Sequence, residues 1–211
     1  MNDAVAGGAE VSPEAHRGFL NKYYGISRHF YDLTRKYYLF GRDREIKQLL
    51  SEDWNSLLEI GPGTGRNLTE LHQGRPSARF FGVEASDEML AHAQAKCPFA
   101  KLIHGFAEST DLSGVFAERP ERILYSYCLS MVVDPDAALA NSVSALSPGG
   151  EVVIVDFGDF KSIPGPFARL MRKWLVTFHV NPVSPALLEK HGAEVSFGPG
   201  RYFLRARIRA S

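Results

Sequence analysis

The stretch Leu57-Leu58-Glu59-Ile60-Gly61-Pro62-Gly63-Thr64-Gly65-Arg66-Asn67 decides the fold of this chain. It opens with a short apolar run, which predicts a buried strand, and it ends where a helix is expected to begin, at about Asn67. Between them, three glycines let the backbone turn sharply and come close to a ligand, because no Cβ shields the loop's N–H groups. The following helix presents its positive end nearby. The stretch therefore predicts a strand, a cofactor-binding loop and a helix.

An acidic residue at the end of the next strand narrows the choice of ligand. Residues 78–83 form a second apolar run that ends in Glu84, about 20 positions after the first glycine. A carboxylate at this place binds the two hydroxyls of a ribose. The alternative is a solvated carboxylate that caps the helix starting at Ser86-Asp87-Glu88, but Ser86 is itself a good cap. We therefore expect Glu84 to bind a ribose.

Glu59, just before the glycine loop, argues against a dinucleotide. Dinucleotide folds usually carry the pattern Gly-x-Gly-x-x-Gly and bind a pyrophosphate at the helix N-terminus. A carboxylate beside the loop repels a pyrophosphate and attracts the ammonium group of an amino acid. Residues Glu59 to Gly65, with Glu84, closely resemble the first two motifs of the class I S-adenosylmethionine-dependent methyltransferases. The resemblance implies that the loop holds the methionine part of the cofactor and Glu84 its ribose.

The resemblance also implies a set of cofactor contacts. Phe106 departs from the family, which commonly has an acidic residue there that binds the adenine amine. Two interpretations stay open: Phe106 stacks on the base while the Ala107 N–H and Glu108 supply hydrogen bonds, or Phe106 belongs to the core. The residues expected to bind S-adenosylmethionine are Tyr31, Glu59, Gly61, Pro62, Gly63, Gly65, Asn67, Glu84, Ala85, Met89, Phe106, Ala107 and Tyr127.

The remaining pattern predicts a single-domain Rossmann-like α/β fold with a seven-stranded, mostly parallel sheet. Further strands are expected at residues 100–103, 122–127 and 152–157, with helices between them. The last two strands, 193–197 and 202–209, are joined by Gly198-Pro199-Gly200 and predict an antiparallel hairpin. Class I methyltransferases also end in such a hairpin. We expect residues 46–211 to form the S-adenosylmethionine-binding domain and residues 1–45 an N-terminal helical lid segment.

The reacting end of the cofactor is expected beyond the strand at 122–127, because ligands of open α/β sheets bind past the carboxyl ends of the strands. Tyr127, Ser130 and Met131 are the candidates to face it. Asp156, at the end of the next strand, either orients a substrate amine or pairs with an arginine. No metal is expected to take part, since methyl transfer depends mainly on positioning the acceptor.

The N-terminal segment is rich in tyrosine, with Tyr23, Tyr24, Tyr31, Tyr37 and Tyr38 interleaved with Lys and Arg. Tyrosine faces and hydroxyls suit a sulfonium ion. We expect this segment to cover the cofactor site and bring Tyr31 and Arg35 into it; the alternative is that it lies on a helix layer.

Composition limits the other classes of function. The chain has 211 residues, of which 45% are hydrophobic, enough for one core, and its formal net charge is zero, which argues against nucleic-acid binding. Cys97 and Cys128 lie far apart and predict reduced thiols in a cytoplasmic protein. Residues 166–178 predict a basic amphipathic helix, which either touches the inner membrane face peripherally or packs on the core with solvated charges. No feature decides the oligomeric state.

Three stretches narrow the resemblance. Residues 31–44, Ser126 to Met131, and Val155 to Gly158 with Phe178-His179-Val180 resemble the bacterial N-methyltransferases that make the betaine lipid diacylglyceryl-trimethylhomoserine. This resemblance implies methylation of an amine, lipid-linked or small. Attack on the aminocarboxypropyl chain is an alternative, by transfer of that group or by cyclisation to azetidine-2-carboxylate and methylthioadenosine. A non-enzymatic cofactor-binding module is the third.

Overall fold

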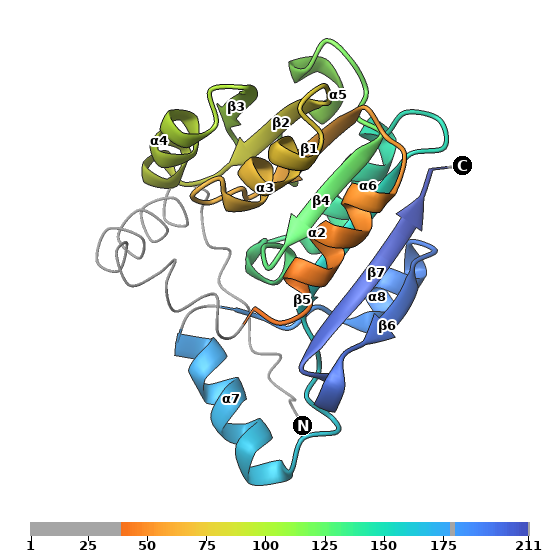
Figure 1. The fold of residues 1–211 in the computed structure, drawn as a ribbon. Coiled ribbons are helices and arrows are strands. Elements are labelled where there is room, and N and C mark those ends of the chain that lie inside the picture. Colours follow the sequence, from red (N-terminus) through yellow and green to blue (C-terminus); the bar gives the residue numbers. More distant parts are fainter. Residues whose placement is uncertain (1–38, 178–179, 211) are drawn as a thin grey trace, which may run out of the picture.

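The computed structural model describes residues 39–177 and 180–210, and in these ranges seven strands form one sheet in the order β3-β2-β1-β4-β5-β7-β6 (Figure 1). The first five strands run parallel, and β7 pairs antiparallel with both β5 and β6. The expected mostly parallel sheet with a C-terminal antiparallel hairpin is therefore confirmed. The strands are β1 (Ser56–Ile60), β2 (Arg79–Glu84), β3 (Ala100–His104), β4 (Arg122–Ser126), β5 (Glu151–Phe157), β6 (Glu194–Phe197) and β7 (Phe203–Arg209).

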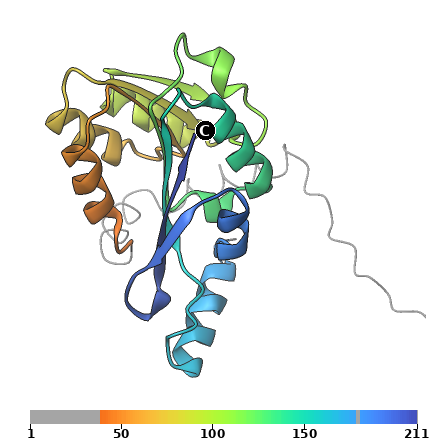
Figure 2. The same cartoon turned by 90° about the vertical axis from the view of Figure 1, so that its right-hand side faces the viewer.

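Helices cover both faces of the sheet (Figures 1 and 2). Successive side chains of a strand point to opposite faces, so Leu57 packs with α2, α3 and α4 while Leu58 packs with α5, α6 and α8. The short helix α5 and the two 3-10 turns are absent from the sequence expectation. The helices are α2 (Arg42–Ser51), α3 (Arg66–Gly74), α4 (Asp87–Lys96), α5 (Leu112–Val115), α6 (Pro135–Ala145), α7 (Gly165–Thr177) and α8 (Pro185–Lys190), with turns η1 (Leu129–Met131) and η2 (Pro199–Arg201).

Helix α7 stands beyond the end of the sheet, apart from the helices that cover its faces (Figure 1). Its Leu175 is 1% exposed and packs in a cluster with residues at the ends of β4 and β5, whereas Phe167 and Leu170 are 65% and 62% exposed. One side of the helix is therefore part of the core, and another presents apolar side chains to solvent. Within the described ranges, no helix has both the length and the apolar character needed to cross a bilayer.

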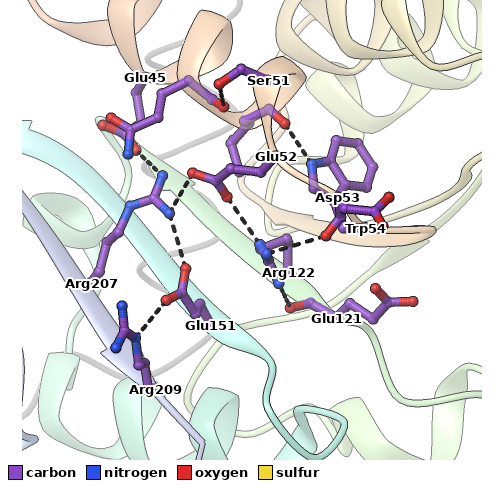
Figure 3. A network of polar contacts seen from close by, with 12 residues as sticks. Glu45, Ser51, Glu52, Asp53, Trp54, Glu121, Arg122, Glu151, Arg207 and Arg209 are labelled. Carbon is purple, nitrogen blue, oxygen red and sulfur yellow. Dashed lines mark hydrogen bonds and ion pairs between the residues drawn. The ribbon is translucent and has the colours of Figure 1, made fainter.

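An ion-pair network fixes α2 to the antiparallel end of the sheet (Figure 3). The Arg207 guanidinium on β7 lies 2.7 Å from carboxylate oxygens of Glu45 and Glu52 and 2.9 Å from one of Glu151. Glu45 is 1% exposed, so its charge is stabilised by these partners and not by water. The network holds the start of α2 close to the glycine loop.

Candidate active site

The glycine loop adopts a backbone that only glycine accommodates without strain. Gly61, Gly63 and Gly65 have φ of 65°, 58° and 75°, in the left-handed region. A Cβ on Gly61 would come within 2.4 Å of the Cys128 Sγ. The Gly61 N–H donates to the Val83 carbonyl at 2.8 Å, which ties the loop to the end of β2. Gly61 is therefore required both by its backbone conformation and by its packing against Cys128.

A pocket lies beyond the carboxyl ends of β1, β2 and β4, with an empty volume of about 620 Å³ that includes its open side. Eight residues predicted from the sequence line it. Phe106 is among them and is half-buried, which places its ring in the pocket wall and not in the core. The lining residues are Ile60, Gly61, Gly63, Val83, Glu84, Ala85, Gly105, Phe106, Ala107, Glu108, Tyr127, Cys128, Met131 and Val132.

The Glu84 carboxylate bridges two backbone segments at this pocket. The Gly63 N–H donates to its Oε2 at 2.9 Å and the Ser86 N–H to its Oε1 at 3.0 Å, and the residue is 6% exposed. Ser86 is the N-cap of α4, accepting from the Met89 N–H at 3.4 Å. Glu84 is thus a buried, oriented carboxylate and not a solvated cap.

A smaller pocket, with an empty volume of about 400 Å³, adjoins the larger one through Gly61. Glu59 lies in it, 1% exposed, and accepts a hydrogen bond from Asn67 Nδ2 at 2.7 Å. The buried carboxylate is a preformed partner for a cation. The lining residues are Leu39, Arg42, Glu59, Gly61, Pro62, Thr64, Arg66, Asn67 and Ser126.

Three predicted residues line neither pocket. Gly65 serves as the N-cap of α3, and Met89 is 1% exposed in the interior beside α4. Ser130 is 3% exposed, and its backbone is held inside the fold. Tyr31 and Arg35 lie outside the described residues.

Tyr127 links the larger pocket to the start of the described chain. Its φ of 55° is left-handed, its side chain is nearly buried, and its hydroxyl donates to the Phe40 carbonyl. Its ring meets that of Phe157 edge-on at 4.8 Å. Burial, with the negative charge of Asp156 as a further cause, raises the pKa of the Tyr127 phenol. This phenol is therefore a hydrogen-bond donor and not a proton acceptor.

Asp156 performs neither of the two roles considered for it. The residue is fully buried, and its carboxylate accepts the Ser130 N–H at 3.0 Å and the Phe157 N–H at 2.7 Å. The Ser130 carbonyl accepts from the Asn181 N–H at 2.8 Å. Burial raises the pKa of Asp156 to about 6. The carboxylate thus positions the turn η1, from which Met131 reaches the pocket.

Sequence reasoning missed several pocket residues. Val83, Cys128 and Val132 are contributed by strand ends and the turn after β4, and the signal available was their position next to Glu84, Tyr127 and Met131. Arg42 reaches the smaller pocket through the packing of α2, which no local pattern indicates.

Burial raises the pKa of Glu108, which lines the larger pocket.

Comparison with known proteins defines the class. A family described as "Methyltransferase domain" matches residues 31–192, most of the chain, and the chain belongs to this family. The demethylmenaquinone methyltransferase of Tropheryma whipplei (strain Twist) is 25% identical over 167 residues, 76% of this chain and 68% of that protein. The dTDP-3-amino-3,4,6-trideoxy-alpha-D-glucopyranose N,N-dimethyltransferase of Streptomyces venezuelae is 31% identical over 100 residues, 47% of this chain and 41% of that protein.

The solved structure of the N-methyltransferase NodS from Bradyrhizobium japonicum, in complex with S-adenosyl-L-homocysteine, has the same fold, with a TM-score of 0.60 and 19% identity over 81% of this chain and 87% of that one. The family confirms the expected class, an S-adenosylmethionine-dependent methyltransferase, and its cofactor. None of these three relatives is a betaine-lipid enzyme.

The pockets fit this cofactor. Glycines of the loop line both pockets, and one oriented carboxylate lies in each pocket, Glu84 in the larger and Glu59 in the smaller. A ribose diol and an ammonium group are the matching partners for two such carboxylates.

Proposed function

We propose that this chain transfers the methyl group of S-adenosylmethionine to an amine, and that the acceptor is carried on an apolar or lipid-linked molecule. The proposal rests on the two pockets that share Gly61. One pocket would serve as the site for the nucleoside of the cofactor, and the other as the site for its amino-acid end.

The larger pocket would hold the nucleoside. The Glu84 carboxylate accepts the Gly63 and Ser86 N–H groups, and it is the group that would bind the ribose hydroxyls. Phe106 would stack on the base, with the Ala107 N–H and Glu108 as hydrogen-bonding neighbours. In the smaller pocket Glu59 would bind the ammonium group.

The bound cofactor supplies an electrophilic methyl group on a sulfonium ion. The chain's part is to hold and orient, which by itself accounts for a large part of the acceleration of such a reaction. Tyr127 and Met131 line the larger pocket next to the end of β4, where the acceptor is expected. Because the Tyr127 hydroxyl is engaged by Phe40, this residue would offer its aromatic ring to a cation.

Two observations support an amine on an apolar carrier. One relative is named as an N,N-dimethyltransferase and another acts on demethylmenaquinone by its name. In addition, Trp174 of α7 lies edge-on to Phe157 at 6.5 Å, so the helix with exposed Phe167 and Leu170 packs directly behind the Tyr127 wall of the pocket.

The nucleoside product tests the reaction. The protein is incubated with S-adenosylmethionine alone and with a lipid-linked homoserine amine, and products are measured by mass spectrometry. S-adenosylhomocysteine with a methylated amine supports the proposal. Methylthioadenosine, particularly without added acceptor, would instead indicate attack on the aminocarboxypropyl chain, and no product with either mixture would indicate a binding module.

Vesicle binding tests the lipid-linked acceptor. Sedimentation with phosphatidylglycerol vesicles should weaken with salt and in a Phe167→Ser/Leu170→Ser variant, because interfacial docking needs buried apolar area and basic residues. Val176→Ser is the matched control, since Val176 is 69% exposed and lies opposite Phe167 on the helix. A protein that ignores these vesicles would exclude docking through α7 and leave a small amine as the acceptor.

A further inference from the structure

A row of aromatic rings runs from the larger pocket to helix α7. Tyr127, in the pocket wall, meets Phe157 edge-on with ring centroids 4.8 Å apart, and Phe157 meets Trp174 of α7 edge-on at 6.5 Å. We propose that Phe157 and Trp174 position the Tyr127 ring, so that the occupancy of the larger pocket and the placement of α7 are linked. This inference deepens the proposed function and rests on it for the ligand that fills the pocket.

Tyr127 needs support from its surroundings. Its φ of 55° is strained for a residue with a Cβ, and such conformations persist only where neighbouring contacts hold them. The Tyr127 N–H donates to the Val155 carbonyl at 2.8 Å, and the hydroxyl donates to the Phe40 carbonyl. These two bonds fix the backbone and the tip of the side chain. Phe157, which is 4% exposed, packs against the ring between them.

A second connection joins α7 to the pocket through the backbone. Leu175, near the end of the helix, is 1% exposed, and its carbonyl accepts the Val180 N–H at 3.1 Å. The next residue, Asn181, donates its N–H to the Ser130 carbonyl at 2.8 Å. Ser130 belongs to the turn η1, from which Met131 reaches the larger pocket. The end of α7 is therefore tied to the pocket wall at two places, the ring row and the turn η1.

Another side of α7 is exposed. Phe167 and Leu170 on this side are 65% and 62% exposed. Close-packed side chains transmit small displacements to their neighbours, so a ligand that presses on Tyr127 should shift the surroundings of Trp174. Because linkage between two sites is reciprocal, a surface that docks on the exposed side of α7 should change the affinity of the pocket.

Trp174 is a natural reporter of this linkage. The chain has two tryptophans, and the other, Trp54, is 1% exposed in the core beside α2. Saturation with S-adenosylhomocysteine, with binding followed by isothermal titration, should change the tryptophan emission of the wild type. Trp174→Phe, which keeps a ring in the row, should bind this ligand as the wild type does and lose the change in emission.

Phe157→Leu removes the middle ring. An edge-on ring pair is worth roughly a twofold to tenfold change in an equilibrium constant, so the loss of this support for Tyr127 should weaken the binding of S-adenosylhomocysteine by about that factor. At saturation the emission of Trp174 should no longer respond. Phe116→Leu is the matched control, since Phe116 is 2% exposed and packs on Phe81 outside the row. It should keep both the affinity and the response, with thermal unfolding to confirm that each variant is folded.

The outcomes are distinct. If isothermal titration shows that the wild type is saturated and its tryptophan emission does not change, the inference is wrong and the proposed function stands. A response that survives in Trp174→Phe or in Phe157→Leu would also overturn it, because the signal would then not pass along the row. A response lost in Phe116→Leu as well would overturn it too. A wild type that does not bind S-adenosylhomocysteine would refute the proposed function together with the inference.

Discussion

Replacing Asp156 by Asn should change how the stability of this protein depends on pH. Asp156 is fully buried at the end of β5, where its carboxylate holds the turn η1 beside the cofactor pocket. Burial raises its pKa from an ordinary value of 3.8 to about 6. Between these two values the folded protein binds more protons than the unfolded chain, so stability falls as the pH rises.

The magnitude follows from the two pKa values. A shift of about two units corresponds to about 3 kcal/mol lost between low pH and pH 7, most of it between about pH 4 and pH 6. The difference in unfolding free energy, wild type minus Asp156→Asn, should therefore decrease by about 2 kcal/mol from about pH 4.5 to pH 7. The variant does not titrate at this position, so other groups cancel in the difference.

Urea unfolding followed by tryptophan fluorescence at a series of pH values provides the measurement. Asp159→Asn is the control with the opposite sign. Arg201 donates to both Asp159 oxygens, at 2.7 and 2.6 Å, and lowers the pKa of that carboxyl. The unfolding free energy of the wild type minus that of Asp159→Asn should increase with pH through the acid range, because the ion pair with Arg201 stabilises the fold only while the Asp159 carboxylate is ionised. A flat difference for Asp156 would refute the account of a buried, charged carboxylate at this turn.

Three further predictions concern the pocket and its cover. Gly61→Ala should destabilise the protein by about 1–2 kcal/mol and weaken the binding of S-adenosylhomocysteine at least roughly tenfold. Adding Cys128→Ala should restore part of the stability and part of the affinity, because it removes the Sγ atom that the new Cβ would meet. A double variant with no recovery would contradict this contact. Tyr127→Phe should cost about 1–2 kcal/mol of stability, because it loses the hydrogen bond to the Phe40 carbonyl, and should keep its affinity for S-adenosylhomocysteine, because the ring stays in the pocket wall; a large loss of affinity would contradict a hydroxyl engaged by Phe40 alone. If residues 15–38 belong to a lid, their hydrogen exchange should slow when S-adenosylhomocysteine binds, and unchanged exchange would argue for permanent structure.

Local pattern was sufficient for the parallel half of the sheet and for eight of the residues that line the larger pocket. The short apolar runs before Gly61 and Glu84 predict two strands, and the glycine loop and the carboxylate mark where these strands end. The same residues line the pocket, so the strand ends and these pocket residues could be predicted together. The helix starts at Ser86 and Asp134 were predictable because a side chain of the right type caps each one.

What the sequence did not reveal depends on contacts between distant elements. Arg42 and Glu59 share a pocket only because α2 packs beside the glycine loop, and α2 is held there by Glu45, which pairs with Arg207 at the far end of the chain. The role of Asp156 was missed for the same reason, since its partner Ser130 belongs to another strand end. For Phe106 the sequence left two interpretations open, and packing places the residue in the pocket wall.

The most direct test of the cofactor site is the affinity of S-adenosylhomocysteine for wild type, Glu84→Ala and the control Glu88→Ala, measured by isothermal titration, with thermal unfolding to confirm that each variant is folded. Glu84→Ala should lose about 2 kcal/mol, about thirtyfold in affinity, because the ribose hydroxyls would be left without their buried carboxylate. Glu88→Ala should bind as the wild type does. Wild-type affinity in a folded Glu84→Ala variant would contradict the assignment of this pocket to the nucleoside.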